Sequence, residues 1–463
     1  MAMTEAALSC VRNAAAAAHG IPNEVLAKIF EICVQDDAEQ ADRMLSMLEQ
    51  ICRRWRSVLL GTPTLWTHIT LQHPNLRPRN QLSLMSAYLR RSGGCPLYVW
   101  LTDADDLDDF LPLLQSHANR LRYLSVNGRT FEGLHRIAAS LRDLPAPELR
   151  RLQFTINSHP PSRAVQQSLM PMSMFKGGTP KLTHVHVQLA GALDVFPLQV
   201  PETTASLKIT PYPTTIPLNG LRNVLYNLHN LTELTVHGDL VPVHSMAYTA
   251  DVVEAPQLRR LIQFVGRRHC TSLWPAVLRA PTLEHITLFA REAGKLRDFC
   301  DDGPMAMATG PFPEQPALRS FTLAARPFDN HRCDDSIWGR CRAMHLCSQF
   351  HDALVSVRHL TLVNICRGGE VLEDMLALAP DGPRMPHIQV VDVSSPSIDW
   401  ERLRHALELR KSEGHPLHGI GLPCAVFDEG AAHLLASVEV VRQFSEAAAI
   451  EDPFFAGQPM TGL

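Results

Sequence analysis

Apolar residues recur at three- and four-residue spacing near the start of the chain, which is the pattern of helices that bury one side. A first stripe over residues 25–33 predicts a helix that begins at Ile21-Pro22, because proline needs no N–H at a first helical position. A second stripe over residues 44–59 predicts another helix, which Gly61 ends. These helices carry more apolar surface than a module of about 50 residues encloses, so either a partner or the next domain covers the excess.

A different pattern recurs from about residue 96: a turn, often with proline, followed by Leu-x-x-Leu-x-Leu. Its copies begin at Leu121, Leu149, Leu182, Leu231, Leu283, Leu318, Val357 and Ile388, and weaker copies begin at Leu207 and Leu258. Successive copies lie roughly 20 to 40 residues apart, in the range of leucine-rich repeats. Each copy predicts a short strand with its last two apolar residues on one side, and such units bury those residues only when they stack.

Amphipathic segments between these strands predict helices behind them, at residues 107–117, 221–228, 337–354 and 371–378. Alternation of strand and helix favours a parallel sheet, so the predicted fold class is α/β. The predicted organisation is an N-terminal tail (1–20), a small all-α module (21–71), an irregular leucine-rich-repeat-like α/β solenoid (96–425) and a C-terminal cap or tail (426–463). A layered α/β domain that is not a solenoid stays open.

The residues between the paired apolar positions would line one open face of such a stack, which is the usual docking surface of a solenoid. The candidate target-binding residues on this face are Arg151, Gln153, His184, His186, Glu233, Thr235, His285, Thr287, His359 and Thr361. The alternative is that polar residues at these positions only keep the surface of the sheet in contact with water and bind no partner. The face as a whole is therefore the candidate site, rather than any single residue.

Composition narrows the class of protein. Hydrophobic residues make up 45% of the chain and charged residues 19%, which is typical of a globular protein with a large core. The net charge of −4 gives no case for nucleic-acid binding. Eleven scattered cysteines indicate reduced thiols in an intracellular compartment, cytoplasmic or nuclear. No apolar run reaches the roughly 18 residues that a membrane span needs.

Three clusters of residues suggest a metal site or a basic binding site, but none fits such a site well. The histidines and cysteines at residues 331–351 lack the paired spacing of zinc sites, and the aspartates at 103–109 lack the glycine and closing glutamate of a calcium loop. The basic side chains of Arg53, Arg54 and Arg56 are expected to form the solvated side of a helix. Since no nucleotide-binding or hydrolase motif is present either, we predict no metal, no cofactor and no catalytic residue.

The segments IPNEVLAKIFEIC (residues 21–33) and ICRRWRSVLLGTPTLWTHI (residues 51–69) closely resemble the F-box, in the form common among fungal F-box proteins. The resemblance implies helices that bind the Skp-type adaptor of a cullin-RING ubiquitin ligase. The positions that match the apolar positions of the family are Ile21, Pro22, Ile29, Phe30, Ile51, Cys52, Trp55, Leu65 and Trp66. Some of these would be core and some adaptor contacts, and the sequence does not separate the two groups.

The resemblance and the repeats together predict a non-catalytic substrate-recognition adaptor. Its F-box would hold the Skp-type adaptor, and a cullin through it, while the repeats would hold an unidentified target protein. The chain would act as a monomer within a hetero-complex, without nucleic acid or membrane. The alternative is a scaffold or interaction protein that uses the same module outside any ligase.

Overall fold

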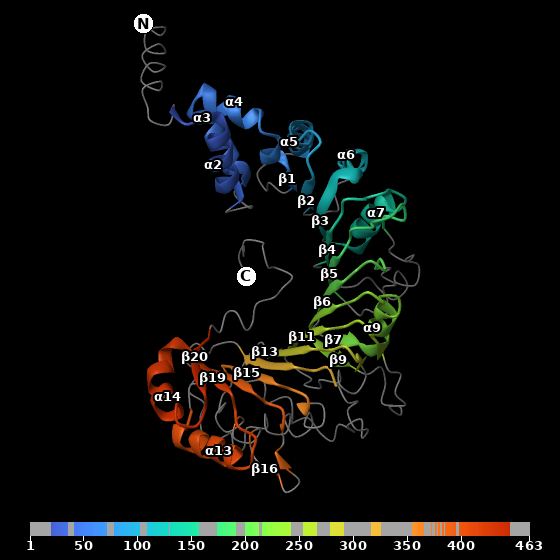
Figure 1. Cartoon of the computed structure of the whole chain (residues 1–463). Helices are drawn as coiled ribbons and strands as arrows, with labels where there is room; N and C mark the ends of the chain where they lie inside the picture. The colour runs from blue at the N-terminus through green and yellow to red at the C-terminus, as the bar shows by residue number, and fades with distance from the viewer. Residues whose placement is uncertain are drawn as a thin grey trace, which may run out of the picture. The chain divides into compact units, whose positions relative to one another are not determined.

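The structure is a computed structural model (Figure 1), which describes residues 20–35, 41–71, 78–101, 109–128, 130–156, 174–190, 200–212, 215–241, 253–265, 278–290, 316–325, 354–364, 372, 376, 378–379, 382–383, 385–394 and 398–444. These residues fall into two compact units. The first unit contains the described residues up to 156 together with residues 174–182, and the second contains those from 183 to 444.

The described part of the first unit begins with four helical segments. They are α2 (Asn23–Gln35), α3 (Ala41–Ile51), α4 (Arg53–Leu60) and the 3₁₀ turn η2 (Pro63–Trp66). Leu26, Phe30 and Val34 lie four residues apart on α2 and are buried, so this helix packs one side against α3, α4 and η2. The helical region predicted near the start of the chain is therefore confirmed.

A break at Cys52 corrects the prediction of a single helix over residues 44–59. Cys52 has extended backbone angles, with φ −158° and ψ 165°. Its thiol accepts a hydrogen bond from the backbone N–H of Trp55, with sulfur and nitrogen 3.5 Å apart, and so caps the start of α4. Because the spacing of apolar residues continues across the break, the sequence pattern alone predicts one helix.

Parallel strands follow in the first unit, in the order β1-β2-β3-β4. They are β1 (His68–Leu71), β2 (Leu97–Leu101), β3 (Leu121–Gly128) and β4 (Arg151–Ile156), and the helical segments between them are α5 (Pro78–Arg91), α6 (Leu111–Ser116), η4 (Ala118–Arg120) and α7 (Phe131–Leu141). In β1, Ile69 and Leu71 are buried while His68 and Thr70 are half-buried. This two-residue alternation places one side of the strand in the core.

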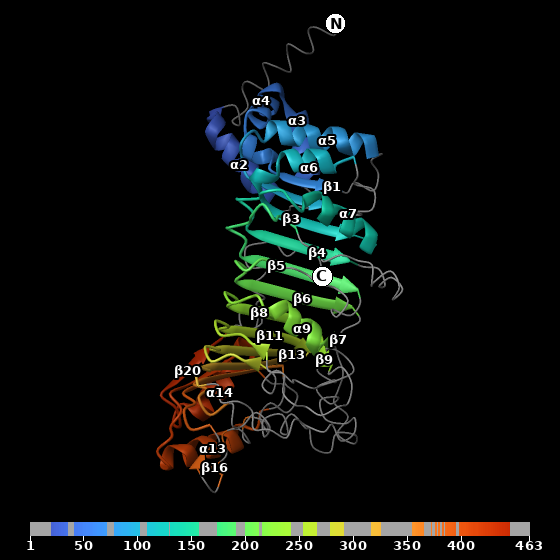
Figure 2. The same ribbon diagram turned by 90° about the vertical axis from the view of Figure 1, so that its right-hand side faces the viewer.

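Ten parallel strands form the sheet among the described residues of the second unit (Figure 2). In their order across the sheet they are β5 (His184–Ala190), β6 (Ser206–Tyr212), β8 (Glu233–His237), β11 (Arg260–Val265), β13 (His285–Ala290), β14 (Ser320–Ala325), β15 (His359–Val363), β18 (Val390–Ser394), β19 (Gly419–Leu422) and β20 (Val440–Gln443). Neighbouring strands in this order run parallel.

Shorter elements complete the second unit. Strand pairs are formed by β7 (Thr215–Pro217) with β9 (Asp239–Val241), β10 (Val253–Glu254) with β12 (Leu278–Arg279), and β16 (Leu378–Ala379) with β17 (Gly382–Pro383). The described helical segments are α9 (Leu218–Leu225), α13 (Trp400–Ser412), η7 (Cys424–Val426) and α14 (Phe427–Leu434). Helices are therefore few beside strands in the described part of this unit.

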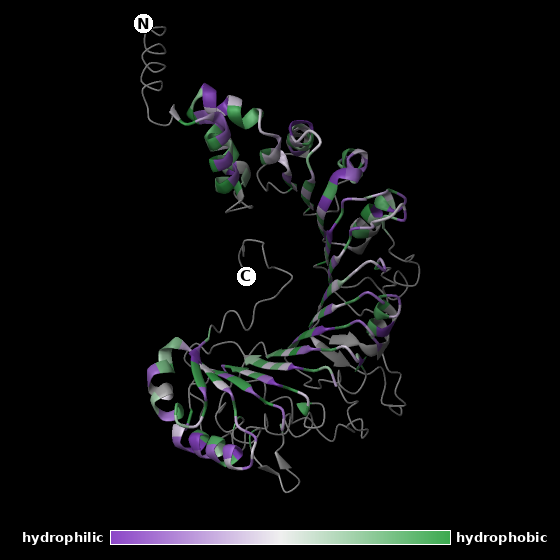
Figure 3. Cartoon of the chain, in the orientation of Figure 1, coloured by the Kyte–Doolittle hydropathy of each residue, from purple (hydrophilic) through white to green (hydrophobic). Residues whose placement is uncertain are grey.

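The register of the second unit aligns the repeated motif in rows across the strands. Leu261 on β11 pairs with Leu234 on β8 and with Ile286 on β13, and all three side chains are buried. The residues between the apolar ones point to the opposite side, so hydropathy alternates along the strands in Figure 3. We call this opposite side the polar face. Each apolar row packs on the next, so no single strand needs a core of its own.

The predicted strands are confirmed, since each copy of the motif forms a parallel strand. Among the described residues, the strands extend beyond the predicted range 96–425, since the first begins at His68 and the last ends at Gln443. The predicted helix at 107–117 is shorter, as α6, and the one at 221–228 is displaced to α9. Most of 337–354 and of 371–378 lies outside the described residues.

Candidate functional site

One side of α2 is apolar but exposed to solvent. Val25, Ile29 and Ile32 lie at positions i, i+4 and i+7, and their relative exposures are 47%, 40% and 49%. This spacing puts the three side chains on one side of the helix, which we call the α2 stripe. On α3, Met47 and Ile51 lie four residues apart and are more than half exposed. These apolar side chains form a candidate contact surface for another protein.

Aromatic residues behind this surface hold the helices in place. The rings of Phe30 and Trp55 lie 5.0 Å apart between centroids. Trp66 is buried and donates its indole N–H to the backbone carbonyl of Leu59 at 2.9 Å. The guanidinium of Arg91 lies 4.3 Å above the centroid of the Trp66 ring. The α2 stripe is thus presented by a packed module rather than by an isolated helix.

Two polar contacts tie α2 to later parts of the module. The Thr64 hydroxyl donates to the Glu31 carboxylate at 2.6 Å, and this hydrogen bond, assisted by Lys28, lowers the pKa of Glu31. The guanidinium of Arg54 donates to the side-chain oxygen of Asn23 at 3.0 and 3.1 Å and to the backbone carbonyl of Ile21. Both contacts fix the orientation of α2.

These contacts correct the expectation that the three neighbouring arginines only form a solvated helix side. Arg53 is exposed, as expected, and Arg56 is exposed with its Nε donating to the carbonyl of Glu49 at 3.1 Å. Arg54 is different, because it joins α4 to the start of α2. A run of arginines in a sequence does not indicate which of them meets a backbone carbonyl more than 30 residues away.

The structure divides the predicted adaptor-binding residues into two groups. Phe30, Leu65 and Trp66 are at most 2% exposed, so they are core of the module rather than accessible contact residues. Those that remain accessible are Pro22, Ile29 and Ile51, which are exposed, and Ile21, Cys52 and Trp55, which are half-buried. The sequence assignment missed Val25, Ile32 and Met47. Only the packing of α2 and α3 shows which side of each helix stays uncovered.

On the strands of the first unit, two candidate residues lie beside aromatic rings. Arg151 and Gln153 are half-buried on β4, and Gln153 accepts a hydrogen bond from the hydroxyl of Tyr123 at 3.0 Å. His68 and Tyr98 stack with 4.7 Å between ring centroids and 3° between ring planes. Burial lowers the pKa of His68, which favours its neutral form at neutral pH.

On the polar face of the second unit, the candidate residues differ in exposure. His285 is exposed, and His184, Glu233, Thr287 and His359 are half-buried. His186, Thr235 and Thr361 are at most 5% exposed, which corrects their assignment as target contacts. Burial, followed by the charges of Lys208 and His237, lowers the pKa of His186 well below its usual value. It is therefore a neutral, buried side chain.

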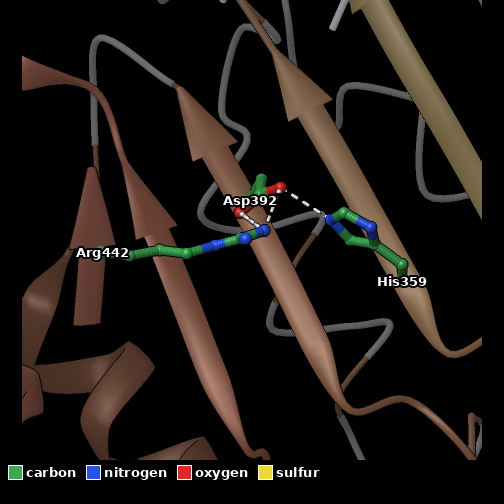
Figure 4. Close-up of polar contacts among 3 residues, drawn as sticks. All are labelled: His359, Asp392 and Arg442. Carbon is green, nitrogen blue, oxygen red and sulfur yellow. Dashed lines mark hydrogen bonds and ion pairs between the residues drawn. The ribbon is translucent and has the colours of Figure 1, made fainter. Parts of the chain in front are cut away.

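A polar network missing from the prediction lies at the β15–β20 end of this face (Figure 4). Oδ2 of Asp392 lies 2.6 Å from Nε2 of His359, and Arg442 donates to both carboxylate oxygens at 3.0 and 3.1 Å. Burial alone raises the pKa of Asp392, but the hydrogen bond from His359 and the charges of His359 and Arg442 lower it overall. A Cβ atom on Gly421 would lie 1.9 Å from Oδ1 of Asp392, so this position requires glycine when the carboxylate is in place.

The described residues contain neither a metal-ligating cluster nor a membrane-spanning helix. Within the described ranges, no group of three or more histidine, cysteine, aspartate or glutamate side chains could hold a metal ion. The histidines and cysteines at 331–351 and the aspartates at 103–108 lie outside those ranges. None of the described helices has both the length and the hydropathy to cross a membrane.

Comparison with known proteins identifies the N-terminal module. Residues 19–72 match the family model described as F-box-like. The match covers α2, α3, α4, η2 and β1, so the chain contains an F-box-like domain at the position that the sequence resemblance indicated. F-box domains bind Skp-type adaptors, which gives the kind of partner expected here. A search of curated proteins found no match for the chain.

Proposed function

We propose that the chain is the substrate-recognition adaptor of an SCF-type ubiquitin ligase. The α2 stripe and its neighbours on α3 bind the Skp-type adaptor, and the strands bind a target protein. The observation that supports this most directly is the α2 stripe, because α2 buries its opposite side at Leu26 and Phe30 yet exposes Val25, Ile29 and Ile32.

The energy of covering this surface is sufficient to help hold a complex. Full burial of an exposed isoleucine or valine side chain contributes about 1.5–3 kcal/mol, so covering three half-exposed ones contributes about 3 kcal/mol. An amphipathic helix that lays its apolar side against a partner is a common recognition mode. The F-box-like match at residues 19–72 makes the Skp-type adaptor the natural occupant.

The strands provide the second half of the proposal. Copies of Leu-x-x-Leu-x-Leu stacked in register are consistent with an irregular leucine-rich-repeat-like α/β solenoid. In this proposal the chain does no bond chemistry. It raises the effective concentration of the target near the charged ubiquitin-conjugating enzyme and orients it. The proposed location is intracellular, in the cytoplasm or the nucleus.

Affinity purification followed by mass spectrometry tests this proposal. The full chain should recover the Skp-type adaptor, a cullin and a RING subunit. Ile29→Glu places a charge in the α2 stripe and should abolish their recovery. Leu435→Glu is the matched control, because Leu435 is also exposed but lies outside the module, and it should recover all three.

Two results would count against the proposal. Recovery of the Skp-type adaptor without cullin and RING subunits would favour a ligase-independent scaffold that uses the same module. Equal recovery by the wild type and Ile29→Glu would show that the α2 stripe is not the contact surface.

A further inference from the structure

Arginines gather at the N-terminal ends of four neighbouring strands in the second unit. At the position just before each strand, β11, β13, β14 and β15 have Arg259, Glu284, Arg319 and Arg358, and the first residues of these strands are Arg260, His285, Ser320 and His359. We call these eight residues the arginine rim. It contains four arginines against one glutamate, although the whole chain has a net charge of −4.

Backbone hydrogen bonds hold the outer residues of the rim in one ladder. The N–H of Glu284 donates to the carbonyl of Arg259 at 2.8 Å, that of Arg319 to Glu284 at 2.9 Å, and that of Arg358 to Arg319 at 2.9 Å. Neighbouring strands lie about 4.8 Å apart, so Arg259 and Arg358 start about 14 Å from one another. This distance equals the length of about four residues of extended chain, which is the separation between the first and fifth residues of such a segment.

Of the acidic side chains near the rim, Glu233 and Asp392 are each paired with an arginine. Glu233 lies 4.0 Å from Arg260, and Glu284 lies 3.9 Å from His285. Asp392 is 5% exposed and is paired with His359 and Arg442, so it adds little negative charge to the surface.

Within the described residues, three arginines of the rim remain available. Arg259, Arg319 and Arg358 are exposed, and none of them forms an ion pair with a residue in the described part of the chain. Nε of Arg260 is buried without a hydrogen-bond partner there. Burial, and next the charge of Arg260, lower the pKa of His285, so this neighbouring histidine stays neutral at neutral pH. Among the described residues, the rim therefore presents several guanidinium groups and few competing acids.

We propose that the arginine rim binds an extended, acidic segment of the target protein, with carboxylate side chains paired to Arg259, Arg319 and Arg358. The planar guanidinium group matches a carboxylate through two parallel hydrogen bonds, which favours this chemistry. The inference rests on the proposed function only for the statement that the ligand is a target of the ligase.

Fluorescence anisotropy with the purified full chain tests the proposal. The probe is a labelled peptide of five consecutive glutamates with Gly-Ser flanks, and the control peptide has glutamines instead. We expect the glutamate peptide alone to bind, and its affinity to fall as salt rises, because salt screens exposed charges. The triple variant Arg259→Ala/Arg319→Ala/Arg358→Ala should lose about 10- to 100-fold in affinity, from three pairs of up to about 1 kcal/mol each.

A second triple variant controls for total charge. Arg402→Ala/Arg404→Ala/Lys411→Ala removes three exposed cations from α13 and should change the affinity less than twofold. Equal losses in the two triple variants would overturn the proposal. So would equal binding of the glutamine peptide, no binding of the glutamate peptide at low salt, or tighter binding of a single-stranded oligonucleotide of equal charge.

Failure of this inference can be told apart from failure of the proposed function. The rim variant should still bind the purified Skp-type adaptor as the wild type does, because the F-box-like domain is unchanged. If the wild-type chain did not bind the adaptor, that result would contradict the ligase proposal but would not affect the conclusion from the peptide experiment.

Discussion

Replacing Gly421 by alanine should disrupt the Asp392 network. The added Cβ would lie 1.9 Å from Oδ1 and 2.9 Å from Cγ of Asp392, so the carboxylate must move away. Asp392 is 5% exposed, and its oxygens bond to His359 and Arg442. After such a move, the buried carboxylate would lose at least one of its two hydrogen-bond partners.

The expected cost follows from these contacts. A hydrogen bond to a charged group contributes about 1.5–3 kcal/mol. The side chains of His359 and Arg442 are 38% and 50% exposed, so solvent screens part of that energy. We therefore expect Gly421→Ala to lower the free energy of unfolding by about 2–3 kcal/mol.

A double-mutant cycle in urea, followed by far-UV circular dichroism, separates this cause from others. In an Asp392→Ala background the clash is absent, so Gly421→Ala should cost less than about 1 kcal/mol there. Gly419→Ala is the matched control on the same strand, because its Cβ would meet nothing closer than 3.4 Å. The reasoning is refuted if Gly421→Ala costs the same with and without Asp392, or no more than Gly419→Ala.

Three further results are expected. Trp66→Ala should lower the free energy of unfolding by about 3–5 kcal/mol, measured by urea denaturation, because it empties a buried site and removes the hydrogen bond to Leu59; a cost under 1 kcal/mol would show that the ring is not core. Cys52→Ser should stabilise α4 by up to about 1 kcal/mol, since a hydroxyl caps better than a thiol, and an unchanged melting temperature would contradict the cap at Trp55. The pKa of Asp392 is lowered by folding, so its stabilisation is complete above the unfolded pKa of about 4 and is lost as pH falls through the folded pKa. The urea midpoints of the wild type and Asp392→Asn should therefore differ at pH 7 and converge in acid; a constant difference would refute the paired carboxylate.

The strands of the second unit were predictable because their signal is local and repeated. Leu234, Leu261 and Ile286 occupy equivalent places in successive motifs, and the structure aligns them in one buried row. Strand β20 was missed because Val440 to Gln443 lacks the full leucine motif, although its backbone pairs with β19. A repeated motif allows a strand to be predicted from sequence. A strand at the edge of the sheet can pair without that motif.

Side-chain roles that depend on distant partners could not be predicted. Nothing in the sequence distinguishes Arg410 from the other charged residues around it. In the structure, however, Arg410 is fully buried and donates to the carbonyl of Met385 at 2.9 Å. Phe30 and Ile29 are adjacent in the sequence, but the fold buries the first and exposes the second. Which of two neighbouring apolar residues faces a partner depends on where the next helices pack. The break at Cys52, which the sequence pattern did not predict, makes α4 a separate helix.

The most direct measurement of the central claim is amide hydrogen exchange, read by mass spectrometry, on the full chain with and without a purified Skp-type adaptor. Covering the α2 stripe suppresses local opening of the helices beneath it. We predict slower exchange in α2 and α3 when the adaptor is present in excess, and no change in the strands of the second unit. Unchanged exchange across residues 23–51 under the same conditions would contradict the account.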